Sequence, residues 1–170
     1  MLILEGNREY TNFKQYTNKL FVYSWLLSMK NIIPQEIINI LEKLQASGYD
    51  AYIVGGCVRD YSLGRKPKDW DITTSAKPEE IQEVFPGSFY ENKFGTVTIL
   101  TESEDIALKA IEITPFRIEG KYSDRRHPDE IKFAKTLKED LSRRDFTINA
   151  MAIKQDKVVD YFGGKEDLEN

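Results

Sequence analysis

The chain has 170 residues, of which 41% are hydrophobic and 31% are charged, with a formal net charge of −4 and a pI near 5.2. These values indicate one soluble globular domain with its own core, and they are unlike those of a typical polynucleotide-binding protein, which is basic. The single cysteine, Cys57, excludes an intramolecular disulfide and favours a reducing compartment, which we expect to be the cytoplasm. No apolar run approaches the roughly 20 residues of a membrane span, so we expect no membrane partner.

The first 28 residues differ from the rest of the chain. They are rich in Tyr, Asn and Lys and show no clean periodicity, whereas Met29 begins a run that reads like a natural start. We therefore predict that residues 1–28 are an N-terminal extension of unclear role, outside a functional core at residues 29–162.

From Pro34 onward the pattern alternates between helix and strand signals. In the first half we predict helices at 34–48, 58–63 and 78–85, with strands at 51–54 and 69–74. In the second half we predict paired strands at 95–100 and 107–116, a mobile polar loop at 117–130, a strand at 131–134, helical turns at 137–141 and 146–151, and a hairpin of 152–153 with 158–159. This order indicates a mixed α/β domain with a small central sheet.

A glycine pair, Gly55-Gly56, closes the first predicted strand, and Arg59 follows it. Two glycines at such a junction allow close backbone approach and positive φ, so amide N–H groups can face an anion. Arg59 is near enough to reach a phosphate there. A tight strand–helix turn without a ligand explains the pair equally well, and the Gly-Lys-Ser/Thr of a Walker loop is absent.

Asp69 and Asp71 stand one residue apart in Lys-Asp-Trp-Asp-Ile-Thr-Thr. If this run is a strand, both side chains point the same way, roughly 7 Å apart. Their repulsion needs an opposing charge, and a divalent cation such as Mg²⁺, which prefers oxygen ligands, supplies one. The alternative is a pair of exposed carboxylates that form salt bridges with neighbouring basic residues, namely Arg65, Lys66 and Lys68.

Glu112 is the candidate third carboxylate. Ile111 and Ile113 flank it in a predicted strand and point to one face, so Glu112 points to the other and can join the two aspartates.

The last cluster runs from Glu139 to Ala150. Its adjacent arginines, Arg143 and Arg144, offer forked donors to phosphates, and the aspartate beside them offers a carboxylate to ribose hydroxyls. Composition alone favours a plainer reading, in which Asp145 or Thr147 caps a helix and the arginines are solvated.

Together these segments resemble one family. Gly-Gly-x-Val-Arg-Asp, Asp-Trp-Asp-Ile-Thr-Thr, Phe-Gly-Thr-Val, Glu-Ile-Thr-x-Phe-Arg and Asp-Leu-x-Arg-Arg-Asp-Phe-Thr-Ile-Asn-Ala-Met are similar to the class II tRNA nucleotidyltransferases (CCA-adding enzymes) and bacterial poly(A) polymerases. The resemblance runs from about Ile33 to the C-terminus. It implies a polymerase-β-like nucleotidyltransferase head, an α/β fold with a small mixed central sheet flanked by helices.

The resemblance also implies a role for each site residue. Two Mg²⁺ ions would be bound by Asp69 and Asp71, with Glu112 as the third acidic residue. The remaining implied residues bind the nucleotide: the triphosphate by Gly55, Gly56 and Arg59, and the rest of the nucleotide by Arg144, Asp145 (at the ribose 2′-hydroxyl) and Asn149.

The implied reaction adds CMP or AMP from CTP or ATP to the 3′ end of tRNA by two-metal in-line transfer, with release of pyrophosphate. A-adding, CC-adding and poly(A)-adding variants share these segments, and a non-catalytic nucleotide-binding module that kept the fold is the alternative from another class. In the family a Glu-Asp-x-x-Arg segment on a helical neck reads the base. We find none after Asp160, and we predict that residues 163–170 begin the linker to that neck. The sequence does not indicate an oligomeric state.

Overall fold

The computed structural model describes residues 33–169 with gaps at 92–94, 119–121, 125–126 and 129–131. The chain divides into two units, Met1–Pro34 and Gln35–Asn170. The predicted extension, residues 1–28, lies outside the described residues, so the second unit alone is considered below.

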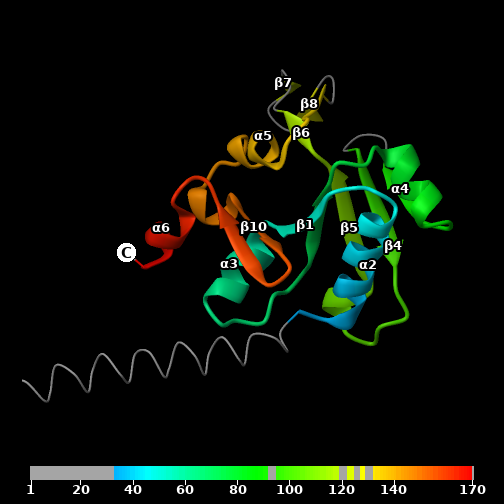
Figure 1. Cartoon of the computed structure of the whole chain (residues 1–170), viewed down its shortest axis with the longest axis horizontal. Coiled ribbons are helices and arrows are strands. Elements are labelled where there is room, and N and C mark those ends of the chain that lie inside the picture. Colours follow the sequence, from blue (N-terminus) through cyan, green and yellow to red (C-terminus); the bar gives the residue numbers. More distant parts are fainter. Residues whose placement is uncertain (1–32, 92–94, 119–121, 125–126, 129–131, 170) are drawn as a thin grey trace, which may run out of the picture. The chain divides into compact units, whose positions relative to one another are not determined.

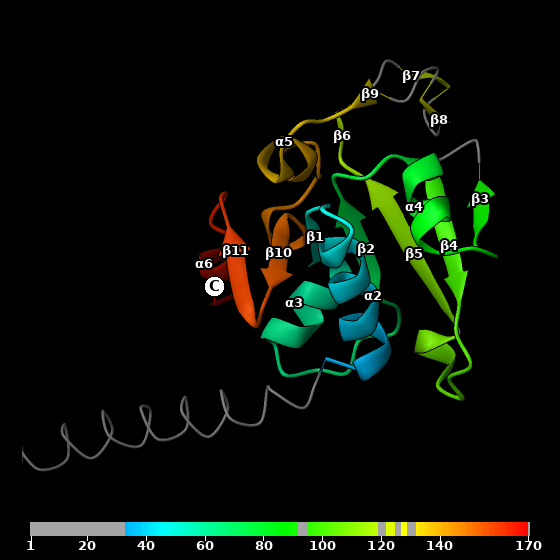
Figure 2. The same ribbon diagram turned by 45° about the vertical axis from the view of Figure 1, so that its right-hand side comes forward.

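A seven-stranded mixed sheet forms the centre of this unit (Figures 1 and 2). Its strand order is β11-β10-β1-β2-β5-β4-β3, and β2 and β5 are the parallel pair. The strands are β1 (Ala51–Val54), β2 (Asp71–Thr74), β3 (Phe89–Glu91), β4 (Thr96–Leu100), β5 (Ala110–Pro115), β10 (Met151–Lys154) and β11 (Lys157–Asp160). Two small strand pairs stand apart from it: β6 (Arg117–Ile118) with β9 (Lys132–Phe133), and β7 (Tyr122–Asp124) with β8 (His127–Pro128).

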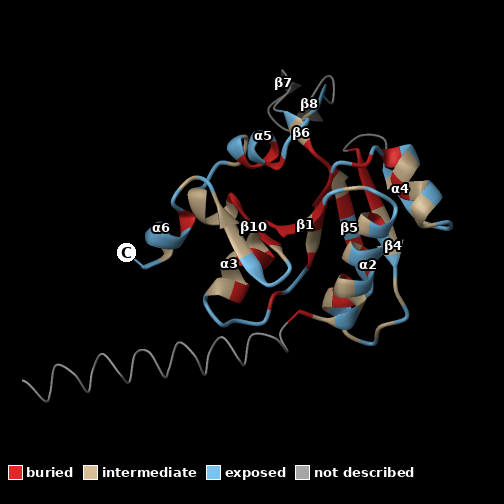
Figure 3. Cartoon of the chain, in the orientation of Figure 1, coloured by how far each residue is buried: buried red, intermediate tan, exposed pale blue. Residues whose placement is uncertain are grey.

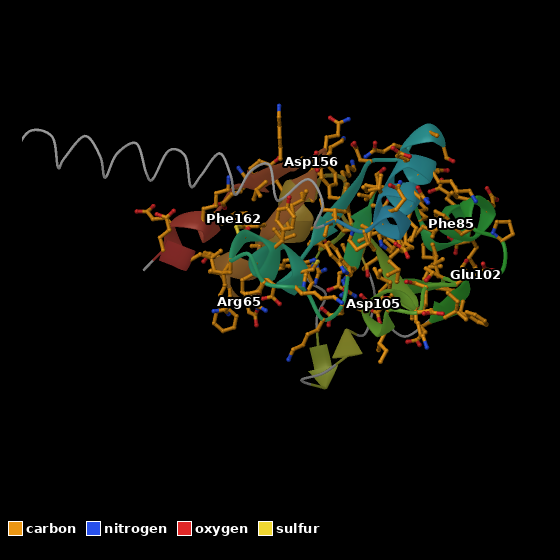
Figure 4. The ribbon with its side chains drawn as sticks, turned by 90° about the horizontal axis from the view of Figure 1, so that it is seen from below. Arg65, Phe85, Glu102, Asp105, Asp156 and Phe162 are labelled. Atoms are coloured by element: carbon orange, nitrogen blue, oxygen red, sulfur yellow. The ribbon has the colours of Figure 1, made fainter. Side chains whose placement is uncertain are left out.

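The helices surround the sheet. They are α2 (Gln35–Ala46), α3 (Gly56–Ser62), α4 (Pro78–Val84), α5 (Leu137–Ser142) and α6 (Gly164–Glu169), with 3-10 turns η1 (Ile106–Leu108) and η2 (Thr147–Asn149). Helices α2 and α4 contact each other, α3 packs on β1 and β10, and α6 packs on η2. Figure 4 shows Phe85, after α4, and Phe162, before α6, at opposite ends of the sheet. Among the described helices, none is long and apolar enough to cross a membrane.

The strand register separates the two faces of the sheet. Residues paired directly across neighbouring strands project to the same face. One such row crosses five strands and is at most 1% exposed: Ile153, Ile53, Ile72, Ile113 and Val97. This row forms the main core, and Figure 3 shows the buried residues concentrated in the central strands.

The opposite face is partly apolar and partly acidic. Val54 and Ala152 pack there with Leu137 and Leu141 of α5 in a second apolar cluster. On the neighbouring strands β2 and β5, the residues in register with Val54 are Asp71 and Glu112. Helix α5 therefore covers one part of this face, and two carboxylates occupy the adjoining part.

The predicted fold class is confirmed: the structure is a mixed α/β domain with helices around a central sheet. The segment 117–130 was predicted as a loop, and its described parts are instead short strands, β6, β7 and β8. The turn predicted at 146–151 is a 3-10 turn of three residues, because Met151 already belongs to β10. Strand β3 and helix α6 were not predicted.

Candidate active site

Three carboxylates converge where β2 begins. Asp71, the first residue of β2, pairs with Glu112 in the parallel register. Ile111 and Ile113 are fully buried and Glu112 is exposed, so the predicted orientation of Glu112 is confirmed. Asp69 is exposed in the bend before β2, so the predicted strand 69–74 is two residues too long at its start.

The charges of these residues act on each other. Burial and the neighbouring charges of Asp69 and Glu112 together raise the pKa of Asp71 to about 6, while Arg144 opposes the change. When the pKa of a carboxyl group is raised in this way, any added positive charge stabilises its ionised form. The site therefore favours a cation, and its oxygen donors suit a hard divalent ion such as Mg²⁺.

The carboxylates do not form a closed metal cage. Across the described ranges, no group of three His, Cys, Asp or Glu side chains is arranged to hold an ion by itself. Mg²⁺ is usually bound by one or two carboxylates together with water and substrate phosphates. The residues present fit this open kind of site. The plainer reading of the aspartates gains no support from Lys66, which pairs with Asp105 at 2.7 Å.

Gly55 lies directly against these carboxylates. Its φ of 84° and ψ of −144° lie in a region that residues with a Cβ rarely adopt. A Cβ at this position would be 3.2 Å from Nη1 of Arg144 and 3.4 Å from Oδ2 of Asp71. The glycine thus lets the backbone approach both side chains. The next residue, Gly56, begins α3 and lies against the guanidinium of Arg59. A Cβ at Gly56 would be 3.5 Å from Nη2 of Arg59.

Arg59 is held in place by two side chains. Its Nη1 donates to Oδ1 of Asn149 at 3.0 Å, and its Nε and Nη2 donate to Oδ1 of Asp60 at 3.0 and 2.9 Å. Asn149 belongs to η2, so the contact links α3 to a segment 90 residues later. The structure thus brings together two predicted site residues that the sequence placed far apart.

Arg143 and Arg144 are not solvated, so the plainer reading of this cluster is wrong. Each side chain is only 19% exposed, because both turn toward the carboxylate of Asp140. Arg144 is close enough to Asp71 to affect its pKa. Burial lowers the pKa of Arg144 itself, and the nearby carboxylates of Asp140 and Asp71 oppose that change.

The capping role suggested for this cluster is also wrong. The residue before η2 is Phe146, which makes no side-chain cap, and Thr147 donates instead to the carboxylate of Asp167 in α6. Asp145 is exposed, and its side chain makes no hydrogen bond or ion pair with the described residues. Its predicted contact with ribose therefore stays a prediction.

One residue that lies behind the site was missed. Asp140 was read as part of a helical turn, yet its carboxylate is fully buried against both arginines. The signal was present in the sequence: Leu137, Asp140, Leu141 and Arg144 follow the i, i+3, i+4, i+7 spacing of one helix face. A carboxylate on an apolar face, four residues before an arginine, indicates a buried ion pair.

Cys57 adds no chemistry to this centre. Its thiol donates to the carbonyl of Val54 at 3.0 Å, and burial raises its pKa to about 12. The side chain is therefore a neutral, packed group.

Comparisons with known proteins identify the family of this chain. The family model described as "Poly A polymerase head domain" matches residues 51–170. A CCA-adding enzyme of Geobacillus stearothermophilus is 45% identical over 134 residues, which cover 78% of this chain and 32% of that enzyme. The chain thus spans about a third of the length of the curated relatives it matches.

Two solved structures are similar as well. The Bacillus stearothermophilus CCA-adding enzyme in complex with CTP superimposes with a TM-score of 0.67 at 40% identity, over 79% of this chain and 31% of that one. A tRNA nucleotidyltransferase complexed with a primer tRNA and an incoming ATP analogue has a TM-score of 0.58 at 31% identity, over 76% of this chain and 36% of that one. The resemblance predicted from the sequence segments is therefore confirmed, and the chain belongs to the poly A polymerase head domain family.

Proposed function

We propose that this chain is the catalytic head of a tRNA nucleotidyltransferase that adds CMP and AMP from CTP and ATP to the 3′ end of tRNA. The support is its family, together with the CTP complex of one relative and the complex of another with primer tRNA and an ATP analogue. The observation that carries the proposal is the convergence of Asp69, Asp71 and Glu112 beside Gly55.

Nucleotidyltransferases of this family generally use divalent metal ions. We propose Mg²⁺, bound as two ions by Asp69 and Asp71 with Glu112 as the third carboxylate. When bound, such ions activate the attacking hydroxyl and neutralise charge on the triphosphate and the leaving pyrophosphate. The exposed carboxylates of Asp69 and Glu112 leave the centre open to substrate.

The chain's own residues position the substrate. The backbone at Gly55 and Gly56 and the guanidiniums of Arg59 and Arg144 supply donors and positive charge for the phosphates. Asp145, exposed beside Arg144, is proposed to accept a hydrogen bond from the ribose 2′-hydroxyl. Asn149 fixes the direction of Arg59 through their 3.0 Å hydrogen bond. Catalysis by such a site comes mainly from positioning and charge stabilisation.

The proposal extends to the domain organisation and the compartment. Residues 29–162 are the head, residues 163–170 lead toward a helical neck, and the protein works in the cytoplasm. None of the groups at this centre is specific for one base, so the A-adding, CC-adding and poly(A)-adding activities of the family rest on the same residues.

A direct test is magnesium-dependent nucleotide binding by the 170-residue chain. Isothermal titration with CTP and with ATP should show binding that requires Mg²⁺ and that Asp71→Asn removes. Glu104→Gln, which neutralises an exposed carboxylate in the loop between β4 and β5, is the matched control and should bind as the parent chain does. Nucleotide binding that is indifferent to Mg²⁺ and to Asp71 would overturn the proposal. Incorporation of labelled CMP into tRNA lacking its CCA end, by the complete protein, then tests the reaction itself.

A further inference from the structure

Asp140 is a buried anion whose carboxylate contacts four residues. Its carboxylate has no exposed surface. Oδ1 accepts from Nε of Arg143 at 3.1 Å and from the backbone N–H of Arg117 at 3.2 Å, and Oδ2 accepts from Oγ1 of Thr73 at 3.3 Å. Oδ2 also lies 3.7 Å from Nη2 of Arg144. A buried carboxylate is tolerated only with such partners, because desolvation of an unpaired charge costs several kcal/mol.

The position of this anion relative to the metal-binding carboxylates is fixed by β2. Thr73 follows Asp71 by two residues, so both side chains project from the same face of the strand. Asp140 thus lies on the side of the sheet that carries Asp71 and Glu112, one step further along the strand. Figure 1 shows α5, which ends two residues after Asp140, at the end of the sheet beside β6.

Arg144 lies between the two anions. One end of its guanidinium faces Asp140, while Nη1 lies against Gly55, where a Cβ would be 3.2 Å away. Its Nε is buried and has no hydrogen-bond partner within the described part of the chain. If the Asp140 charge were removed, Asp71 would be the anion left near Arg144, and the arginine would compete with a cation for it.

We propose that Asp140 is a positioning residue: it holds Arg144 beside Gly55 for the triphosphate and keeps this guanidinium from closing onto Asp71. This inference rests on the proposed function, since it assigns Arg144 to the phosphates of the incoming nucleotide. The inference goes beyond the proposed function because it makes the contact between Arg144 and the phosphates depend on Asp140, a side chain that the substrate does not touch.

The alternative role for Asp140 is to hold the fold alone. The two roles differ in what they do to ligands of different charge. A loss of fold stability weakens all nucleotides alike, whereas a displaced Arg144 weakens CTP far more than CMP, because CMP lacks the β- and γ-phosphates.

The test compares Asp140→Asn with Glu139→Gln in the 170-residue chain. Glu139 is its neighbour in α5, and the exposed carboxylate of Glu139 accepts from the backbone N–H of Thr136 at 3.0 Å in the helix cap. For Asp140→Asn we expect the Kd for CTP to rise about tenfold to a hundredfold at fixed Mg²⁺, since a charge-assisted contact is lost, with the Kd for CMP nearly unchanged. The Mg²⁺ concentration that supports half-maximal CTP binding should rise as well. Glu139→Gln should alter the unfolding midpoint alone. Equal losses for CTP and CMP, or none, would overturn the inference.

A second measurement keeps the inference separate from the proposed function and from folding failure. In the free protein, the NMR signal of the Arg144 Nε–H should exchange with solvent faster in Asp140→Asn than in Glu139→Gln; equal rates contradict the inference even if no nucleotide binds. If Asp140→Asn does not fold, adding Arg144→Gln removes the positive charge that the loss of Asp140 would otherwise leave unpaired. The double variant Asp140→Asn/Arg144→Gln should then bind CTP as Arg144→Gln does, because Asp140 acts only through Arg144. A further loss in the double variant would refute this.

Discussion

The substitution Asp71→Asn is expected to stabilise the metal-free protein at neutral pH while it removes magnesium-dependent nucleotide binding. Burial, with smaller contributions from Asp69 and Glu112, raises the pKa of Asp71 from 3.8 to about 6. The folded state therefore holds the Asp71 proton more tightly than the unfolded state does. As the pH rises from about 4 to about 6, ionisation of Asp71 progressively lowers the free energy of unfolding. Above that range the full decrease remains.

The magnitude follows from the two pKa values. A rise from 3.8 to about 6 corresponds to about 3 kcal/mol, at about 1.4 kcal/mol for each pKa unit. This net rise already includes the opposing attraction of Arg144, so asparagine, which resembles the protonated carboxyl group, escapes the whole penalty. We therefore expect Asp71→Asn to be about 2–3 kcal/mol more stable than the parent chain near pH 7.5 and indistinguishable from it near pH 3.

Urea unfolding of both proteins at several pH values, with EDTA present, measures this difference. Comparing the two proteins at each pH cancels the groups whose pKa is lowered in the folded state, namely Asp105, Glu139 and Asp160, which change stability in the opposite direction. Saturating Mg²⁺ with CTP should stabilise the parent chain alone. A variant that is less stable than the parent chain near neutral pH without metal would show that Asp71 is not under electrostatic stress.

Three further substitutions test neighbouring parts of the argument. Glu112→Gln removes one of the charges that raise the pKa of Asp71, so a carboxyl NMR titration should place that pKa lower than in the parent chain. Gly55→Ala places a Cβ on a backbone with φ of 84° and against Arg144, so stability should fall by about 1–2 kcal/mol and CTP binding should weaken. Both are measured beside Gly48→Ala, where φ is also positive but the Cβ meets nothing. Gly164→Ala would overlap the carbonyl oxygen of Thr147 and lie 2.9 Å from Cγ of Met151, so thermal unfolding should show a loss of about 1–3 kcal/mol.

The sheet was predictable because its strands carry a local signal. The alternation of Ile111, Glu112 and Ile113 indicates which way the acidic side chain points, and the parallel register places it opposite Asp71. The glycines at 55 and 56 mark the end of β1 in the same local way. The orientation of Glu112 and the end of β1 each depend on residues within a few positions of one another, so one sequence was sufficient for them, whereas the pairing of β2 with β5 joins residues 41 positions apart.

The parts that were missed depend on contacts between distant segments. The hydrogen bond from Arg59 to Asn149 spans 90 residues, and no spacing rule predicts it. Helix α6 is short and polar, and it is held by the docking of Gly164 on η2 and by the carboxylate of Asp160, which accepts from the backbone N–H of Lys165 at 2.9 Å. Such an element has no apolar periodicity to reveal it.

The arginine cluster shows how charge balance, rather than composition, decides burial. Composition alone favoured solvated side chains for the two adjacent arginines. The deciding residue was Asp140, whose place on the apolar face of α5 requires a buried cation to pair with it. Arg143 and Arg144 supply that charge, but a single carboxylate cannot neutralise both. The excess positive charge is therefore directed toward Asp71, where a triphosphate and its metal ions would bring the balancing negative charge. The site thus places an unneutralised negative charge at Asp71 beside an unneutralised positive charge at Arg144, and the metal–triphosphate complex proposed above would neutralise both.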